Sequence, residues 1–192
     1  MSDITFRHFV TPFGELVLGS HKDELCLCDW RYRRMRAAVD TRVQRGLRGA
    51  FVEGTSRVIE EAIHQLNAYF AGERTTFDLP LRLVGTKFQQ GVWNALLAIP
   101  YGTISTYASL TASVAEPTAI RAVASANGAN ALSIIVPCHR IIGSSGELVG
   151  YAGGLPAKRK LLQLEREVRG GGEPDLFSSL EPTADVVRTV AA

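Results

Sequence analysis

Residues 118–142 read TAIRAVASANGANALSIIVPCHRII, and this stretch decides the fold of the second half of the chain. Its first part has helical spacing and consists almost entirely of Ala, Ser, Thr and Asn around Arg121. Such small side chains would let the helix backbone pack very close to whatever it faces. The apolar run 132–136 is too short for a helix and rich in β-branched residues, so it predicts a buried strand. That strand would deliver Cys138 to a polar turn.

The neighbouring segments predict further short helices. Residues 105–113 have a helical pattern, Glu116-Pro117 breaks it, and 118–126 resume it, which is typical of a helix-turn-helix. Upstream, residues 88–98 predict a helix that Pro100 and the following Gly stop. Downstream, glycine-rich turns at 143–146 and 150–154 precede a last helix that opens with Pro156 in its first turn.

The first third of the chain alternates in the manner of β-strands. Residues 4–9, 16–18 and 25–28 predict a small antiparallel sheet, with a turn at 11–14. From Gly54 to Phe70 the apolar residues recur at helical spacing, with Thr55 or Ser56 as the N-cap and Gly72 just past the end. A helix is therefore expected to cover the sheet, and residues 74–80 form a short strand or connector.

These patterns divide the chain into three parts. We expect an N-terminal α/β domain over residues 1–85 and a mainly helical domain over 86–168. Residues 169–192 turn glycine-rich and acidic, and we expect this tail to be largely disordered.

Composition restricts the class of protein. The 192 residues are 46% hydrophobic and 21% charged, as in an ordinary globular protein, which excludes a disordered chain, collagen and a coiled coil. The sequence contains neither a bilayer-spanning apolar run nor a signal sequence at its start, so a cytoplasmic location without membrane association is expected. Cys26, Cys28 and Cys138 would then remain thiols.

The charge is unevenly distributed. Residues 86–168 carry 7 Lys+Arg against 4 Asp+Glu, whereas residues 1–85 carry 12 against 11. An excess of this size is too small for nucleic-acid binding by phosphate neutralisation alone, so any such partner must be held by a small local surface. The one dense basic run is interpreted as a solvated loop; it comprises Arg31, Arg33, Arg34 and Arg36.

Cys138 is the candidate nucleophile. A thiol reacts as the thiolate, and an ordinary pKa near 8.5 requires a nearby base or positive charge. His139 follows directly, but adjacent side chains on an extended segment point apart, so a bridging water or a turn would have to connect it with Cys138. Glu165 is the nearby acid that could orient the imidazole. The alternative from composition alone is a buried, inert cysteine.

The segment Ile135–Ile142, IVPCHRII, closely resembles the signature of the O6-alkylguanine-DNA alkyltransferases, also called methylated-DNA-protein-cysteine methyltransferases. The resemblance extends in order and spacing over residues 3–168. It includes Phe88-Gln89, Val92-Trp93, Ile99-Pro100-Tyr101-Gly102, Thr106-Tyr107, Ile120-Arg121-Ala122-Val123, Asn127-Gly128-Ala129-Asn130, Ser144-Ser145-Gly146, Gly150-Tyr151-Ala152-Gly153-Gly154 and Leu161-Leu162-Gln163-Leu164-Glu165. Residues 11–14 and 66–72 resemble the smaller N-terminal domain of that family more loosely.

The resemblance implies a fold and an activity. The fold would be a ribonuclease H-like α/β domain followed by a helical domain with a winged-helix-like helix-turn-helix. The activity would be DNA repair by a single, irreversible transfer of the alkyl group from O6-alkylguanine, and from O4-alkylthymine, to Cys138 after base flipping. No cofactor would be required. The partner would be double-stranded DNA bound through its minor groove, and the protein would act as a monomer.

The resemblance also implies residue roles. Cys138, a water, His139 and Glu165 would generate the thiolate, and Asn130 would pin the turn before it. Arg121 would fill the gap left by the flipped base, while Thr118, Ala122 and Ala126 would let the helix approach DNA. Tyr107 would crowd the phosphate and donate a proton to the leaving guanine. The remaining residues would read the guanine edge: Ile141, Ser145, Tyr151 and Ala152.

The chain departs from some relatives in two places. Ala131 and Ser133 stand where those relatives have prolines, and Asn127 where they have an apolar pocket residue, so the wall of the alkyl pocket is altered. Some relatives bind zinc in the N-terminal domain. Here Cys26 and Cys28, on one strand face, lack the usual ligand spacing, so we expect no metal site.

Two other functional classes compete with this interpretation. A DNA-binding module of the alkyltransferase-like type would recognise lesions without transferring the alkyl group, but such proteins lack the cysteine. A Cys–His hydrolase would need an oxyanion hole and turnover, and it gives the helix-turn-helix no role.

Overall fold

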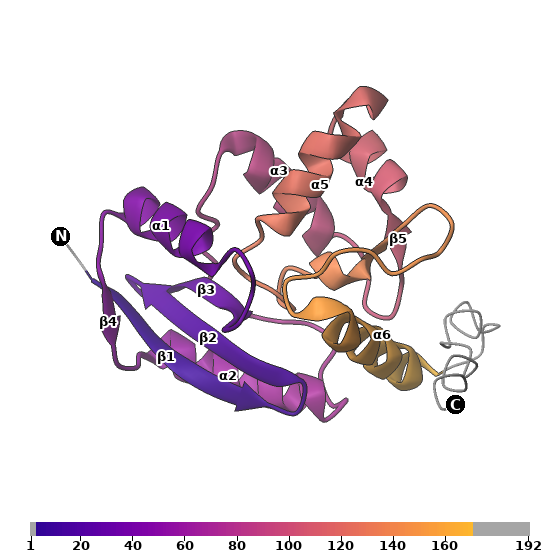
Figure 1. Cartoon of the computed structure of the whole chain (residues 1–192). Helices are drawn as coiled ribbons and strands as arrows, with labels where there is room; N and C mark the ends of the chain where they lie inside the picture. The colour runs from indigo at the N-terminus through magenta and orange to yellow at the C-terminus, as the bar shows by residue number, and fades with distance from the viewer. Residues whose placement is uncertain (1–2, 171–192) are drawn as a thin grey trace, which may run out of the picture.

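The computed structural model describes residues 3–170 (Figure 1). Its first part is a four-stranded sheet with the strand order β3-β2-β1-β4. The strands are β1 (Ile4–Thr11), β2 (Gly14–His21), β3 (Glu24–Trp30) and β4 (Phe51–Glu53). The first three are antiparallel neighbours, and β4 pairs with β1 in parallel. The predicted antiparallel sheet is confirmed, whereas β4 lies in a segment without a strand pattern.

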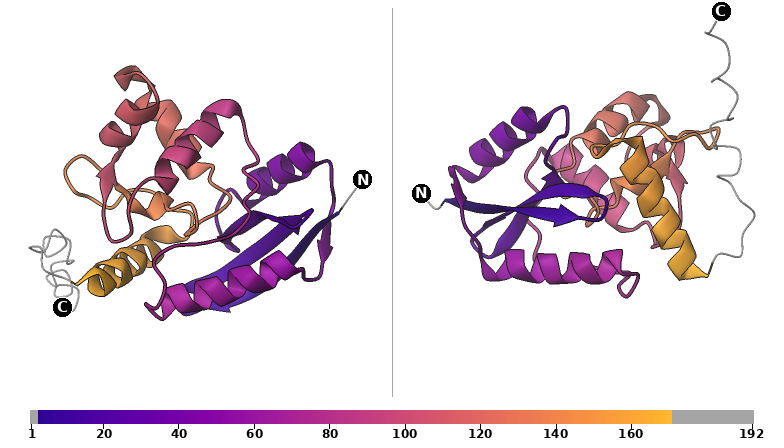
Figure 2. Two further views of the ribbon diagram at one scale, coloured as in Figure 1. Left: turned by 180° about the vertical axis from the view of Figure 1, so that it is seen from behind. Right: turned by 60° about the horizontal axis from the view of Figure 1, so that its bottom comes forward.

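One helix lies on each face of this sheet, as the views in Figure 2 show. Helix α2 (Arg57–Phe70) begins at Ser56, whose side chain accepts a hydrogen bond from the Ile59 amide, as the N-cap prediction required. Helix α1 (Arg36–Leu47) covers the other face with Val39 and Val43. The sequence did not predict α1, because only these two residues of the helix are fully buried and its apolar periodicity is correspondingly weak.

A β-bulge between β2 and β3 corrects the expectation for two of the cysteines. The register shifts at Gly19/Ser20, so the alternation of side chains along β3 is interrupted. Cys26 therefore packs with the α1 side of the sheet and Cys28 with the α2 side. They do not share a strand face, and both thiols are buried.

The second part of the fold is helical. Helices α3 (Lys87–Leu97), α4 (Tyr107–Val114) and α5 (Ile120–Gly128) pack against one another, and a 3-10 turn, Pro117–Ala119, leads into α5. The predicted helix-turn-helix is confirmed. A two-stranded parallel ladder joins β5 (Ser105–Thr106) to β6 (Ile141–Ile142), and α6 (Gly154–Arg169) closes the domain. The mixed sheet followed by a helical region confirms the predicted fold class.

The predicted strand at 132–136 is wrong. This buried segment forms a tight turn in which the Val136 amide donates to the Leu132 carbonyl at 2.8 Å. Ile134 has φ of 74°, in the left-handed region that a β-branched side chain rarely adopts. The next residues, Cys138–Arg140, form a 3-10 turn instead of extended chain.

Two further expectations concern the C-terminal tail and membrane-spanning segments. Of the predicted tail, residues 169 and 170 end helix α6, and residues 171–192 lie outside the described residues. None of the helices between residues 3 and 170 combines the length and apolar character needed to cross a membrane.

Candidate active site

Cys138 begins a 3-10 turn and is 4% exposed. The Asn130 amide donates to its Sγ at 3.2 Å and to the Val136 carbonyl at 2.8 Å. The same side chain accepts from the Leu132 amide at 2.9 Å. Asn130 therefore ties the end of α5, the buried turn and the thiol together.

Burial is the largest electrostatic influence on Cys138. Burial raises the pKa of the thiol, while the Asn130 hydrogen bond and the positive charge of Lys158 oppose that rise. Lys158 is fully buried on α6 and donates to the Ile141 and Val149 carbonyls at 2.5 and 2.7 Å. Burial lowers the pKa of this lysine to about 8. Neither periodicity nor spacing in the sequence indicates that Lys158 lies near the thiol.

His139 and Glu165 form a buried pair. His139 Nε2 and Glu165 Oε1 are 2.8 Å apart, and both side chains are almost fully inaccessible. Burial lowers the pKa of His139 despite its carboxylate partner, so the imidazole is neutral and its Nε2 donates to Glu165. Nδ1 is then an unprotonated acceptor, and it makes no hydrogen bond to any residue from 3 to 170.

Glu165 is the centre of a wider network. Its carboxylate accepts from Tyr69 Oη at 2.8 Å, from the Gly102 amide at 3.0 Å and from two nitrogens of Arg140 at 2.9 Å. Burial opposes its ionisation, but His139 and Arg140 lower the pKa of Glu165 to about 2. Tyr69 belongs to α2 of the other domain. Its contribution could not be found from sequence spacing, because it joins residues 96 positions apart.

The recognition helix α5 exposes only part of the expected surface. Arg121, Ala122 and Thr118 are exposed at its start and on the preceding turn. Ala126 is only 2% exposed, and its carbonyl accepts from Trp93 Nε1 at 2.8 Å. The expectation that Ala126 faces DNA is therefore corrected, since this residue faces α3.

Tyr107 and Asn127 lie together at the start of α4 and the end of α5. The Asn127 amide donates to Tyr107 Oη at 3.2 Å. Burial and the nearby Cys138 raise the pKa of Tyr107, which keeps its hydroxyl protonated and able to donate. The amide nitrogen of Asn127 thus has a polar partner within the site, whereas its buried Oδ1 has none among residues 3–170.

The residues expected to contact a base differ in their exposure to solvent. Tyr151 is half-buried, and its ring packs edge-on against Trp30 and His139, with centroids 6.0 and 6.3 Å away. Ala152 is half-buried beside it, whereas Ser145 is exposed on the turn that follows β6. Ile141 is fully buried, and its amide and carbonyl are already bonded to Cys138 and Lys158.

No group of three or more His, Cys, Asp or Glu side chains within residues 3–170 could hold a metal ion. Burial raises the pKa of Cys26 to about 12 and raises that of Cys28 as well, so both are unreactive neutral thiols.

The buried thiol of Cys138 lies behind a helix-turn-helix and next to the His139–Glu165 pair, an arrangement that fits the class of DNA-binding proteins with a functional cysteine. Family models support this class. Residues 5–83 match the 6-O-methylguanine DNA methyltransferase, ribonuclease-like domain, and residues 87–167 match the DNA binding domain of the same family. The chain belongs to the 6-O-methylguanine DNA methyltransferase family.

Individual relatives agree with this membership. A methylated-DNA--protein-cysteine methyltransferase of Mycobacterium leprae is 45% identical over 163 residues, which are 83% of this chain and 91% of the relative. One of Mycobacterium tuberculosis is 58% identical, but the match spans only 64% of its length and 55% of this chain. A crystal structure of Mycobacterium tuberculosis OGT in complex with DNA has a TM-score of 0.74 at 42% identity, covering 85% of this chain and 94% of that one.

Proposed function

We propose that this chain repairs alkylated DNA by transferring the alkyl group from O6 of guanine to Cys138. The observation that carries the proposal is the Asn130 amide on Sγ of a buried cysteine, beside a neutral His139 held by Glu165. The name of the Mycobacterium leprae relative and the DNA complex of the Mycobacterium tuberculosis structure support the same reaction.

The reaction is a direct displacement. The Cys138 proton passes through a water to Nδ1 of His139, which is free to accept it. The thiolate attacks the alkyl carbon, so that the S–C bond forms and the C–O6 bond breaks. Tyr107 donates its hydroxyl proton to the departing guanine, which leaves as the neutral base. A thioether has no good leaving group, so Cys138 retains the alkyl group.

DNA binding is proposed to use the exposed start of α5. Arg121 enters the base stack from the minor groove and fills the space of the flipped nucleotide, while Thr118 and Ala122 allow close approach. Tyr151, Ala152 and Ser145 contact the extruded base. The protein is further proposed to act as a monomer in the cytoplasm.

The presence of Cys138 disfavours a binding module without transfer. A hydrolase is also disfavoured, because it gives the helix-turn-helix no role.

Intact mass after incubation with duplex DNA containing one O6-methylguanine tests the proposal. We expect one methyl group per chain, on Cys138, and no further turnover with excess substrate. Cys138→Ser should remain unmodified, and Cys26→Ala should behave as the wild type. Multiple turnovers, or a label on Cys26 or Cys28, would contradict the mechanism. A duplex with O4-methylthymine tests the second substrate in the same assay.

A further inference from the structure

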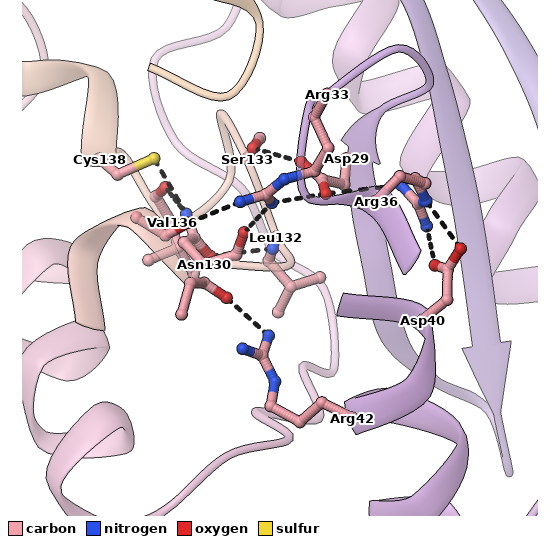
Figure 3. A network of polar contacts seen from close by, with 12 residues as sticks. Asp29, Arg33, Arg36, Asp40, Arg42, Asn130, Leu132, Ser133, Val136 and Cys138 are labelled. Carbon is pink, nitrogen blue, oxygen red and sulfur yellow. Dashed lines mark hydrogen bonds and ion pairs between the residues drawn. The ribbon is translucent and has the colours of Figure 1, made fainter. Parts of the chain in front are cut away.

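A buried polar network connects the N-terminal domain with the reactive cysteine (Figure 3). It begins at Asp29, which is fully buried near the end of β3. Arg33 Nη1 donates to Asp29 Oδ2 at 2.7 Å and to the Asn130 carbonyl at 2.9 Å, and Nη2 donates to the Gly128 carbonyl at 2.5 Å. One guanidinium therefore bridges the two domains.

A second arginine extends the same contact. Arg42 of α1 donates to the Ala129 carbonyl at 2.6 Å. Together the two side chains occupy the carbonyls of Gly128, Ala129 and Asn130, which follow directly at the C-terminal end of α5. The last carbonyls of a helix lack intrahelical partners and carry its negative dipole end, so cations are favoured there. The N-terminal domain thus caps the recognition helix.

The loop that follows is held from the same side. Ser133 Oγ donates to Asp29 Oδ1 at 3.0 Å, and the Cys28 amide donates to the Ala131 carbonyl at 2.9 Å. Ile134 is kept in its left-handed conformation within this loop. A strained residue of this kind persists only where its surroundings determine the conformation.

Asn130 connects these interdomain contacts with the sulfur of Cys138. Its backbone carbonyl accepts a hydrogen bond from Arg33, while its side-chain amide donates to Cys138 Sγ and to the Val136 carbonyl. Only one residue separates the guanidinium from the reacting atom. We propose that Arg33 is a positioning residue for Cys138, which holds Asn130 where its amide stabilises the thiolate.

The geometry of arginine matters for this role. Asp29, the Gly128 carbonyl and the Asn130 carbonyl are reached by two nitrogens of one planar group. A lysine at the same position would keep the charge near Asp29, but a single ammonium on a flexible stem does not reproduce the planar fork. Arg33→Lys therefore keeps the positive charge and removes the planar hydrogen-bonding geometry, so its effect reports on positioning alone.

The groups that act on Cys138 come from several elements. Asn130, Lys158 and Arg33 favour its thiolate, and Asp29 disfavours it. The phenols of Tyr107 and Tyr151 also interact with the thiol. Because Arg33→Lys preserves both Asp29 and the positive charge, it changes the hydrogen bond from Asn130 and leaves this set of charges in place.

The pH dependence of Cys138 alkylation by iodoacetamide tests the proposal on the full chain without DNA. Modification is measured at each cysteine by peptide mass. We expect Arg33→Lys and Arg33→Ala to shift the Cys138 midpoint upward by about one pH unit, the size expected when a hydrogen bond to a charged group is lost. The matched control is Arg34→Ala, which removes an exposed arginine of the same loop and should follow the wild-type curve. Thermal melts establish that each variant is folded.

Single-turnover repair of the O6-methylguanine duplex is the second readout. The positioning role in repair rests on the proposed function, whereas the iodoacetamide profile does not, so the two fail separately. A wild-type protein that transfers no methyl group sinks the proposed function alone. A folded Arg33→Lys with the wild-type thiol profile overturns the positioning role, whether or not repair is slower. If Arg33→Ala does not fold, the thiol pH profile of Arg33→Lys alone still tests the positioning role.

Discussion

A few specific contacts at Cys138 work against the effect of its burial, which still raises the pKa of the thiol. Desolvation alone would keep the thiol neutral, and the opposing influences are the Asn130 hydrogen bond and the charge of Lys158. The nearby base is a neutral imidazole whose free nitrogen can receive the proton. The resting thiol is therefore protonated at neutral pH, and forming its thiolate requires transfer of the proton to an acceptor such as that nitrogen.

Glu165 gives a prediction for acid stability. Its pKa is about 2 in the folded protein against an ordinary value of 4.5, so it favours the folded state at pH above 4.5. This contribution, about 3 kcal/mol, should be lost progressively as the pH falls from about 4.5 to about 2. Urea unfolding of the wild type and Glu165→Gln at a series of pH values measures it. The variant should be less stable near neutrality, and the gap should narrow in acid. A gap independent of pH would contradict the assignment.

The sequence indicated the candidate reactive residues but not the side chains that hold them in place. Cys138, His139 and Glu165 follow from a short motif and from the chemistry that a thiol requires. Arg33 was interpreted as part of a solvated loop, which is wrong: it is 8% exposed and paired with a buried carboxylate. A run of arginines indicates solvent exposure on average, and nothing local distinguishes the one that folds inward toward residues about 95 positions away.

At the scale of elements, α5 combines two tasks on two faces. Val123 and Ala126 are buried against the domain, while Arg121 and Ala122 are exposed. The small residues thus serve packing on one side and close approach on the other. Arg33 and Arg42 fix the end of the helix that leads to Cys138, so the recognition surface and the thiol are held by one rigid connection.

Arg121→Ala tests the role of the exposed face. Extruding a base costs about a few kcal/mol, so loss of the side chain that fills the gap should slow duplex repair by about one to two orders of magnitude. Transfer from the free O6-methylguanine base should be unchanged, because no base has to be extruded. Arg45→Ala, which removes an exposed arginine of α1, is the matched control. Equal losses on duplex and free base would show that Arg121 acts on the chemistry instead.

The segment 132–136 shows why local pattern fails here. Its β-branched composition is that of a buried strand, and the burial was predicted correctly. The conformation is set by hydrogen bonds to side chains outside the segment. The Leu132 amide donates to the Asn130 side chain, and the Ser133 hydroxyl donates to Asp29, which is distant in the sequence. Tertiary contacts therefore override β-propensity, and they leave Ile134 in a conformation that propensity disfavours.

At the scale of the whole molecule, the two domains share one hydrophobic core. Trp30 and Leu66 from the first domain lie in the same buried cluster as Trp93 and Leu161 from the second. Tyr69 donates to Glu165 across this boundary, and Arg33 donates to Asn130 across it. A structural change at the thiol should therefore affect the packing of both domains and alter the free energy of unfolding of the whole chain.

Methylation of Cys138 should lower that stability. The sulfur is 4% exposed, and its surroundings are fixed, since Asn130 is bonded to Val136 and Leu132 while Ser133 is bonded to Asp29. Inserting a methyl group into a close-packed site costs about 1–3 kcal/mol, which for a chain of this size is a fall in Tm of about 2–12 °C. Thermal melts of one preparation before and after reaction with the O6-methylguanine duplex measure the change, after the DNA is removed. Cys138→Ser treated in the same way should not shift, and a benzyl adduct should lower the midpoint further. An unchanged or raised midpoint for the methylated chain would mean that the pocket accommodates the group without moving Asn130.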